Sequence, residues 1–253
     1  MSEIKRRAFL HCLAGASALA ALSHDRLALA GPEAGSAPDR KKVSILGDSM
    51  IAGGFGLYLE QALEKDPGYL VARQGKSSTG LARPDFYNWM KEGQSQCQKE
   101  QPDAVVVMFG GNDGQGLWMG RKAEPEWIRY EEEGWTAEYR RRVNDFADVV
   151  SAGGKELIWI GMPVMRPTKL HSRVAHMNDI YRAEMAIRPH AHFIDIWPIL
   201  ANGEGQYSDH VKVDGKTVRV RAQDGVHLSR SGAHHLVAQV APQIAQIMGP
   251  AAR

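Results

Sequence analysis

The feature that most constrains the fold is a series of five short apolar runs, each bounded by glycine, proline or charged residues. The runs are rich in β-branched and aromatic residues, and they occupy residues 43–47, 69–72, 104–109, 157–161 and 193–197. Continuous apolar runs of this length are typical of parallel strands that are buried on both faces. The sequence therefore predicts a mostly parallel sheet of five strands.

Stretches with helical periodicity separate these runs. They lie at residues 57–65, 136–155, 172–187 and 231–248. The chain has 253 residues, of which 43% are hydrophobic, and this is enough for one sizeable core. Alternating strands and helices predict an α/β fold of three layers, in which a doubly wound sheet has helices on both faces. Such sheets bind ligands beyond the carboxyl ends of their strands.

One segment departs from this alternation. Residues 210–222 alternate apolar and polar side chains around Asp214-Gly215, and an Asp-Gly pair at this place is a strong signal for a two-residue hairpin turn. We therefore expect a β-hairpin insertion here, within a single domain that spans residues 43–250.

The N-terminus has the layout of an export signal. Lys5, Arg6 and Arg7 precede an apolar run, and small residues at Ala28 and Ala30 provide a cleavage pattern. Paired arginines before Phe-Leu resemble the twin-arginine export motif. We expect residues 1–30 to be a signal peptide and residues 31–42, rich in glycine, proline and charge, to be a flexible leader.

This signal implies the export machinery as a partner and a periplasmic or secreted location. The alternative is an amphipathic or membrane-anchoring N-terminal helix. The apolar run is short and rich in alanine, which disfavours a stable membrane anchor.

The charge of the mature chain gives no support to nucleic-acid binding. Residues 1–30 hold four basic and two acidic side chains, so their removal takes Lys plus Arg from 31 to 27 and Asp plus Glu from 29 to 27. The predicted mature chain is then formally neutral. It keeps a single cysteine, Cys97, which we expect to pack as a small hydrophobic side chain.

Three polar motifs follow predicted strands or precede the last predicted helix. Ser49 comes directly after the first strand, Asn112 lies in a glycine-rich segment after the third, and Asp224 and His227 lie just before the last helix. Each motif also has a structural interpretation, as a helix cap or a turn. The carboxyl ends of parallel strands share one edge, so the first two motifs are expected to meet there.

The residue types in these motifs suit nucleophilic catalysis. Serine is a weak nucleophile that needs an adjacent base, and a histidine base needs a carboxylate on its other ring nitrogen. A D-x-x-H turn offers both of these groups from one loop. An asparagine amide is a neutral donor suited to a developing oxyanion.

Together the motifs resemble the SGNH (GDSL-type) hydrolase superfamily. Residues 47–49 match its first block, residues 110–113 its third and residues 224–227 its fifth. Gly75 takes the place of the second block's glycine. Met50 stands where leucine is usual, and Arg73 stands where an asparagine is usual.

The resemblance implies a role for each matching residue. Ser49 would be the nucleophile, His227 the general base and Asp224 the residue that orients His227. The backbone N–H groups of Ser49 and Gly75 and the side chain of Asn112 would form the oxyanion hole. No metal or other cofactor is implied.

We expect substrate contacts from two further places at the same edge of the sheet. Trp118 and Arg121 lie in the long connection that follows Asn112, and Met165 and Arg166 follow the fourth predicted strand. Long connections at the ligand edge often shape substrate pockets.

The sequence thus predicts an exported serine esterase that acts on a small-molecule or glycan ester. The location and the resemblance suggest acyl groups, often acetyl, on cell-envelope polysaccharide or peptidoglycan. One alternative is an O-acyltransferase that uses the same triad. Another is a non-catalytic module that binds the envelope.

Overall fold

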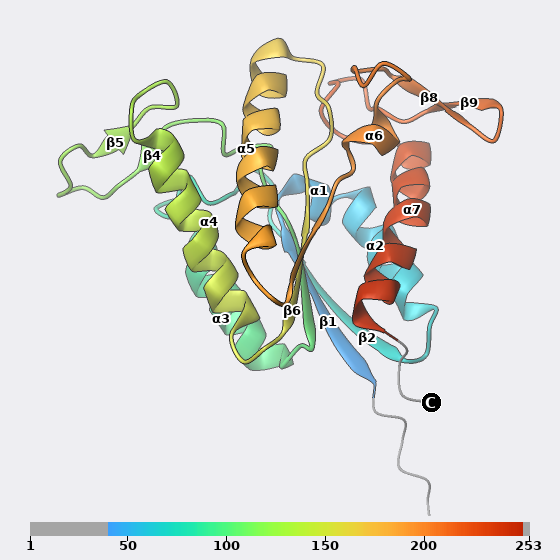
Figure 1. The fold of residues 1–253 in the computed structure, drawn as a ribbon, viewed down its shortest axis with the longest axis horizontal. Helices are drawn as coiled ribbons and strands as arrows, with labels where there is room; N and C mark the ends of the chain where they lie inside the picture. The colour runs from blue at the N-terminus through green and yellow to red at the C-terminus, as the bar shows by residue number, and fades with distance from the viewer. Residues whose placement is uncertain (1–39, 250–253) are drawn as a thin grey trace, which may run out of the picture. The chain divides into compact units, whose positions relative to one another are not determined.

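A single sheet of five parallel strands forms the centre of the computed structural model, which describes residues 40–249. The strands lie in the order β2-β1-β3-β6-β7 (Figure 1). Their bounds are β1 Lys41–Gly47, β2 Tyr69–Gly75, β3 Ala104–Met108, β6 Glu156–Ile160 and β7 Ala191–Ile194. Every neighbouring pair is parallel, which confirms the predicted sheet.

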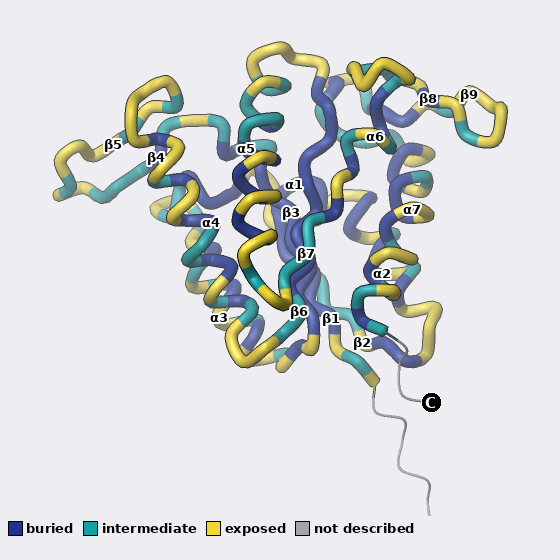
Figure 2. Tube along the Cα trace, in the orientation of Figure 1, coloured by how far each residue is buried: buried dark blue, intermediate teal, exposed yellow. Residues whose placement is uncertain are grey.

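The middle of the sheet is completely buried. Val105, Val106 and Val107 of β3 have no exposed surface. Consecutive buried residues point to opposite faces of a strand, so both faces of β3 must be covered. Figure 2 shows the central strands buried, whereas the helices around them have a buried and an exposed side.

Helices cover both faces of the sheet. They are α1 Ser49–Ala52, α2 Gly54–Glu64, α3 Trp89–Glu100, α4 Trp135–Ser151, α5 Thr168–Ala186, α6 Trp197–Leu200 and α7 Arg230–Met248. Helix α2 packs against α7 on one face, α3 packs against α4 on the other, and α5 contacts α4 and β7 (Figure 1). The predicted three-layer, doubly wound architecture is confirmed.

One helix was missed and one strand was misplaced. Helix α3 was not predicted, because its core-facing residues Trp89, Gly93 and Cys97 form a narrow stripe in an otherwise polar segment. Asn88 nonetheless caps the helix by accepting the N–H of Lys91 at 3.1 Å. The fifth apolar run was placed too late, because β7 ends at Ile194 and Trp197 begins α6.

Two small hairpins lie at the end of the molecule toward which the strands point (Figure 1). Strands β4 (Leu117–Trp118) and β5 (Trp127–Ile128) form the first, and β8 (His210–Val213) and β9 (Lys216–Arg219) form the second. In the turn of the second hairpin, Asp214 and Gly215 have φ angles of 48° and 76°. Two consecutive positive φ angles are the signature of a type I′ turn, which Asp-Gly favours.

The predicted signal peptide and most of the predicted leader lie outside the described residues. Strand β1 begins at Lys41, so the last two residues of the predicted leader belong to the sheet. Within residues 40–249, no helix has both the length and the apolar character needed to cross a membrane.

Candidate active site

Ser49, His227 and Asp224 form a continuous chain of hydrogen bonds. Ser49 is the first residue of α1, directly beyond β1, and the other two lie in the loop before α7. The Ser49 Oγ atom is 2.8 Å from Nε2 of His227. On the other side of the ring, Nδ1 of His227 is 2.6 Å from Oδ2 of Asp224. Ser49 and His227 are 178 positions apart in the sequence, and the fold brings them together.

The carboxylate of Asp224 holds the loop that carries Asp224 and His227 in shape. Oδ1 of Asp224 accepts the N–H groups of Val226 and His227 at 2.8 and 2.9 Å, which leaves Oδ2 facing the imidazole. Partial burial opposes ionisation, but the hydrogen bonds from the His227 ring and from these two N–H groups outweigh it and lower the pKa of Asp224 to about 2. An anionic Asp224 favours a proton on Nδ1, so that Nε2 can accept the Ser49 proton.

Arg166 supports this loop. Its N–H donates to the carbonyl oxygen of Gly225 at 3.0 Å, and its guanidinium donates to the carbonyl oxygen of Gln223. A Cβ atom at Gly225, where φ is 69°, would lie 2.5 Å from Cβ of Arg166. We predicted that Arg166 contacts substrate. The structure places it against the backbone on either side of Asp224.

Asp48 fixes the backbone around Ser49. The side chain is fully buried; Oδ1 accepts the N–H of Met50 at 3.0 Å and Oδ2 accepts the N–H of Gly111 at 3.2 Å. Burial raises the pKa of Asp48 to about 7; the nearby Asp113 carboxylate adds to the shift, and the two N–H bonds oppose it. One carboxylate therefore ties the turn that carries Ser49 to the loop after β3.

Asn112 is oriented by a single hydrogen bond. Its Nδ2 atom donates to the carbonyl oxygen of Thr79 at 3.0 Å. A primary amide has two N–H donors, so this contact directs one of them at Thr79 and leaves the other for a ligand. Gly111 is bonded to Asp48, so Asn112 and Ser49 lie on adjoining loops.

Gly75 ends β2 directly beside α1. It pairs with Gly47 across the sheet, and a Cβ atom at Gly75 would lie 2.2 Å from the backbone nitrogen of Ala52. Only glycine allows α1, and with it Ser49, to lie this close to β2. The predicted oxyanion residues therefore come from three neighbouring strand ends, those of β1, β2 and β3.

Asp113 anchors the loop that carries Asn112, a role that sequence reasoning missed. Its buried carboxylate accepts the N–H of Leu81 at 3.0 Å, the N–H of Ala82 at 2.9 Å and the O–H of Tyr139 at 2.7 Å. Burial raises the pKa of Asp113, against the effect of these donors. The signal in the sequence was the acidic residue directly after Asn112. When such a side chain is buried, its oxygens need hydrogen-bond donors, and these donors tie the loop to its neighbours.

The other predicted substrate contacts do not join the triad. Met165 is buried in the core, and Arg121 is exposed between β4 and β5. Trp118 lines a pocket whose wall includes neither Ser49 nor His227. Across residues 40–249, no three His, Cys, Asp or Glu side chains gather in a way that would hold a metal ion.

Comparison with known families gives one match. A family described as a protein of unknown function (DUF459) matches residues 42–243 of this chain. No curated protein matches it at the level of sequence.

Solved structures show the same fold at low sequence identity. A protein assigned as an SGNH hydrolase, from Slackia heliotrinireducens, is 17% identical, with a TM-score of 0.53 over 83% of this chain and 100% of that one. A carbohydrate esterase of family 3 from Talaromyces cellulolyticus is 14% identical, with a TM-score of 0.54 over 82% and 98%.

A third example is a catalytic mutant of the acetylxylan esterase Axe2 from Geobacillus stearothermophilus. It is 16% identical, with a TM-score of 0.51 over 86% of this chain and 98% of that one. The chain described here belongs to the DUF459 family, and its domain has the fold of the SGNH hydrolases.

Proposed function

We propose that this protein is a serine ester hydrolase whose nucleophile is Ser49. The observation that carries the proposal is the chain of hydrogen bonds from Ser49 Oγ through the His227 ring to Asp224. Because the nucleophile, base and orienting carboxylate are already within hydrogen-bond distance, the base can act without rearrangement.

Acylation would begin with attack of Ser49 Oγ on the ester carbonyl carbon, while Nε2 of His227 takes the hydroxyl proton. The imidazolium that forms is stabilised by anionic Asp224. His227 then gives the proton to the leaving alkoxide, which departs as an alcohol and leaves an acyl group on Ser49.

Deacylation repeats these steps with water. His227 takes a proton from the water that attacks the acyl carbonyl, and it returns the proton to Ser49 Oγ as the carboxylic acid leaves. The free N–H of Asn112 and the backbone N–H groups of Ser49 and Gly75 are the proposed donors to the oxyanion. One such donor is worth about 10²–10³ in rate.

The proposed substrates are acyl groups, above all acetyl, on saccharides of the cell envelope. Two similar folds belong to a carbohydrate esterase and an acetylxylan esterase, and the N-terminal sequence predicts export. Mass spectrometry of envelope glycans from cells with and without the protein tests this. We expect more O-acyl groups in its absence, and identical glycans would contradict the envelope assignment.

Export by the twin-arginine route is a separate proposal. Replacing Arg6 and Arg7 with lysine should leave full-length precursor in the cytoplasm. Normal processing of that variant would contradict this route and would leave the ester chemistry untouched.

The activity itself is tested with 4-nitrophenyl acetate. Wild-type protein should release nitrophenolate, and Ser49→Ala should reduce kcat by at least about 10³. The matched control is Ser172→Ala, since Ser172 is exposed on α5 and bonds only to carbonyl groups of its own helix. Equal loss in both variants, or no loss in Ser49→Ala, would contradict the proposal.

A further inference from the structure

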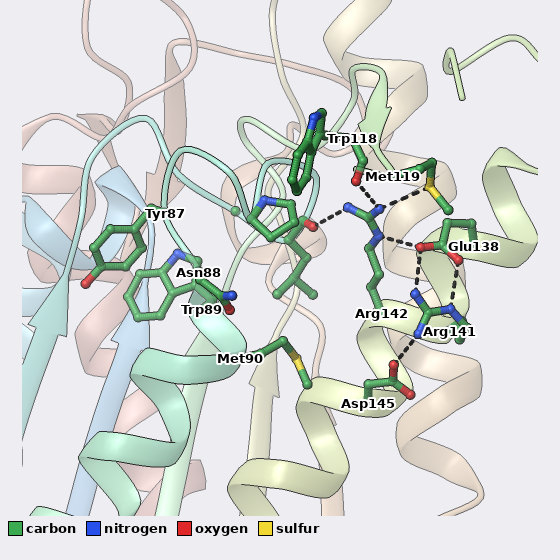
Figure 3. Close-up of a pocket in the computed structure, with 13 residues that line it drawn as sticks. Tyr87, Asn88, Trp89, Met90, Trp118, Met119, Glu138, Arg141, Arg142 and Asp145 are labelled. Atoms are coloured by element: carbon green, nitrogen blue, oxygen red, sulfur yellow. Dashed lines mark hydrogen bonds and ion pairs between the residues drawn. The ribbon is translucent and has the colours of Figure 1, made fainter. Parts of the chain in front are cut away.

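A second candidate site is a pocket of about 260 Å³ between the loop after β2, strand β4 and helix α4 (Figure 3). Tyr87 and Trp89 contribute to one side, Trp118 to another, and Arg141 and Asp145 to the side of α4. The triad residues do not line it. Its volume lies just below the range of about 300–1,000 Å³ for pockets that bind drug-sized ligands, which suits a single ring.

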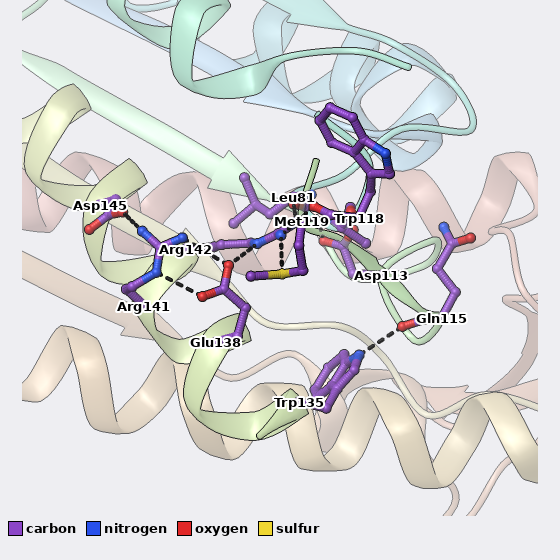
Figure 4. Close-up of polar contacts among 11 residues, drawn as sticks. Leu81, Asp113, Gln115, Trp118, Met119, Trp135, Glu138, Arg141, Arg142 and Asp145 are labelled. Atoms are coloured by element: carbon purple, nitrogen blue, oxygen red, sulfur yellow. Dashed lines mark hydrogen bonds and ion pairs between the residues drawn. The ribbon is translucent and has the colours of Figure 1, made fainter. Parts of the chain in front are cut away.

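One wall of this pocket is held rigidly by Arg142. The guanidinium donates to the carbonyl oxygens of Leu81 and Ala82, both at 2.9 Å, and of Trp118 at 2.6 Å, and it forms an ion pair with Glu138 at 2.7 Å (Figure 4). These bonds link α4 to the loop after β2 and to β4. A pocket built in this way is preformed, and a ligand does not have to order it.

The charges around the pocket balance. Arg141 and Arg142 are matched by Glu138 and Asp145, and each cation contacts at least one of these anions. Such a pocket has no excess charge to attract an ion, which favours a neutral ligand. Among the hydrogen bonds of residues 40–249, Oδ1 of Asp145 and Nδ2 of Asn88 take no part, so both are available to a ligand.

The rest of the lining is aromatic or apolar. Trp118 and Tyr87 are partly exposed. Met90 and Met119 also line the pocket, and Sδ of Met119 accepts an N–H of Arg142 at 3.3 Å (Figure 3). A pyranose ring has an apolar face of C–H groups and a rim of hydroxyls. Its face matches an indole, and its rim matches the carboxylate, amide and guanidinium groups. An acyl chain would take Oδ1 of Asp145 and Nδ2 of Asn88 out of water without giving either a hydrogen-bond partner, at a cost.

The pocket is joined to the candidate active site through Thr79. Trp89, in the wall of the pocket, donates from Nε1 to Oγ1 of Thr79 at 2.9 Å. The carbonyl oxygen of the same residue accepts the Asn112 amide at 3.0 Å. The pocket and the candidate oxyanion donor thus share one loop residue.

We propose that this pocket is a subsite for a neutral pyranose ring of an acylated saccharide, linked to the Ser49 site through Thr79. The role of the pocket in catalysis rests on the proposed ester hydrolysis, but saccharide binding does not. Binding is therefore measured on Ser49→Ala protein, which lacks the proposed nucleophile.

The test is calorimetric titration with xylotetraose, cellotetraose, chitotetraose and maltotetraose. At least one should bind, and Trp118→Ala should raise its Kd at least tenfold. Trp118→Phe, which keeps an aromatic face, should retain most of the affinity. Trp127→Ala is the matched control, since Trp127 pairs with Trp118 in the β4–β5 hairpin but does not line the pocket. It should change Kd by less than twofold.

Asp145→Asn gives a second variant, away from the hairpin, that does not depend on how Trp118→Ala folds. It should also weaken binding, because Oδ1 is no longer part of a charged acceptor. Failure of all four saccharides to bind with a Kd below about 10 mM would overturn the proposal. Binding that is indifferent to both Trp118→Ala and Asp145→Asn would overturn it as well.

The two proposals fail in different ways. If wild-type protein hydrolyses no ester but a saccharide binds and depends on Trp118, the subsite stands and the hydrolase assignment falls. If esters are hydrolysed but no saccharide binds, the subsite falls and the hydrolase assignment stands.

Discussion

Oδ2 of Asp48 accepts the N–H of Gly111 at 3.2 Å, so the residue before the nucleophile is bonded to the residue before Asn112. The other carboxylate oxygen accepts the N–H of Met50. A single buried side chain thereby sets the position of Ser49 relative to its candidate oxyanion donor. The proposed chemistry depends on this relationship, in which the fully buried Asp48 acts through the backbone of its neighbours.

Asp48 should impose a pH dependence on stability. Its folded pKa is about 7, against an ordinary value of 3.8. Between these values the folded chain holds a proton that the unfolded chain has lost, so folding weakens as pH rises, by at most about 1.4 kcal/mol per pH unit. Asp48→Asn cannot titrate. The free energy of unfolding of wild type minus that of the variant should therefore fall from about pH 4 to about pH 7 and then level off.

Urea unfolding at several pH values measures this difference. Asp113 also has a raised pKa, but it titrates in both proteins, so its effect largely cancels in the subtraction. A difference that stays constant with pH would show that burial of Asp48 does not hold its pKa up.

Asp224→Asn should abolish most of the activity while the loop keeps its shape. The amide oxygen can still accept the N–H groups of Val226 and His227, but an NH₂ group would face Nδ1 and force the ring proton onto Nε2. Nε2 could then no longer accept the Ser49 proton, and kcat should fall by about 10³–10⁴.

Steady-state kinetics with 4-nitrophenyl acetate checks this. The thermal midpoint at neutral pH should change little, because a half-exposed ion pair contributes little to stability. A variant that retains more than a tenth of wild-type kcat would show that Asp224 does not orient the base.

Gly75→Ala should displace α1. The new Cβ atom would lie 2.2 Å from the Ala52 nitrogen, and backbone atoms cannot swing aside as a side-chain end can. Overpacking of this kind costs about 1–3 kcal/mol, and the shift of Ser49 should lower kcat/KM at least tenfold. Gly203→Ala is the control, because no atom lies within 4 Å of its added Cβ. Equal thermal midpoints and rates for the two variants would contradict the prediction.

Arg142→Met should destabilise the fold and slow the reaction together. The substitution keeps much of the side-chain volume, but it removes the donors to the carbonyl oxygens of Leu81 and Ala82. The N–H groups of the same two residues hold Asp113, so the Asn112 loop should loosen. The buried carbonyl of Leu81 would lose its donor, whereas the Ala82 carbonyl keeps the N–H of Trp118 and Glu138 keeps Arg141, so the expected loss is about 1–3 kcal/mol.

Thermal unfolding, and kinetics with 4-nitrophenyl acetate, which carries no saccharide, test this prediction on the same samples. Arg141→Met is the matched control, since Arg141 is exposed on the same helix and bonds only to side chains. A loss in the Arg141 variant as large as in the Arg142 variant would contradict the role given to Arg142.

The five strands and the closeness of the Ser49 and Asn112 loops could be predicted from the sequence for the same reason. Parallel strands are buried on both faces, so they appear as apolar runs, and their carboxyl ends share an edge. Helix α3 lacked such a signal, because its buried stripe is only Trp89, Gly93 and Cys97. The β4–β5 hairpin has strands of two residues, too short for any periodicity.

The fate of the predicted substrate contacts was not predictable from position alone. Met165 and Arg166 are neighbours after β6, yet one is buried and the other packs on the Asp224 loop. Side-chain direction in a loop depends on partners distant in the sequence. In the same way, a donor from α4, Arg142, holds the carbonyl of Trp118 and so places this residue in a separate pocket.

The most direct test of the central claim is labelling with a fluorophosphonate followed by peptide mass spectrometry. Such probes react with serine only where a base activates the hydroxyl. The account predicts one adduct on Ser49, lost in Ser49→Ala and strongly reduced in His227→Ala and Asp224→Asn. Absence of any adduct on folded wild-type protein, or an adduct at another serine that persists in Ser49→Ala, would contradict it.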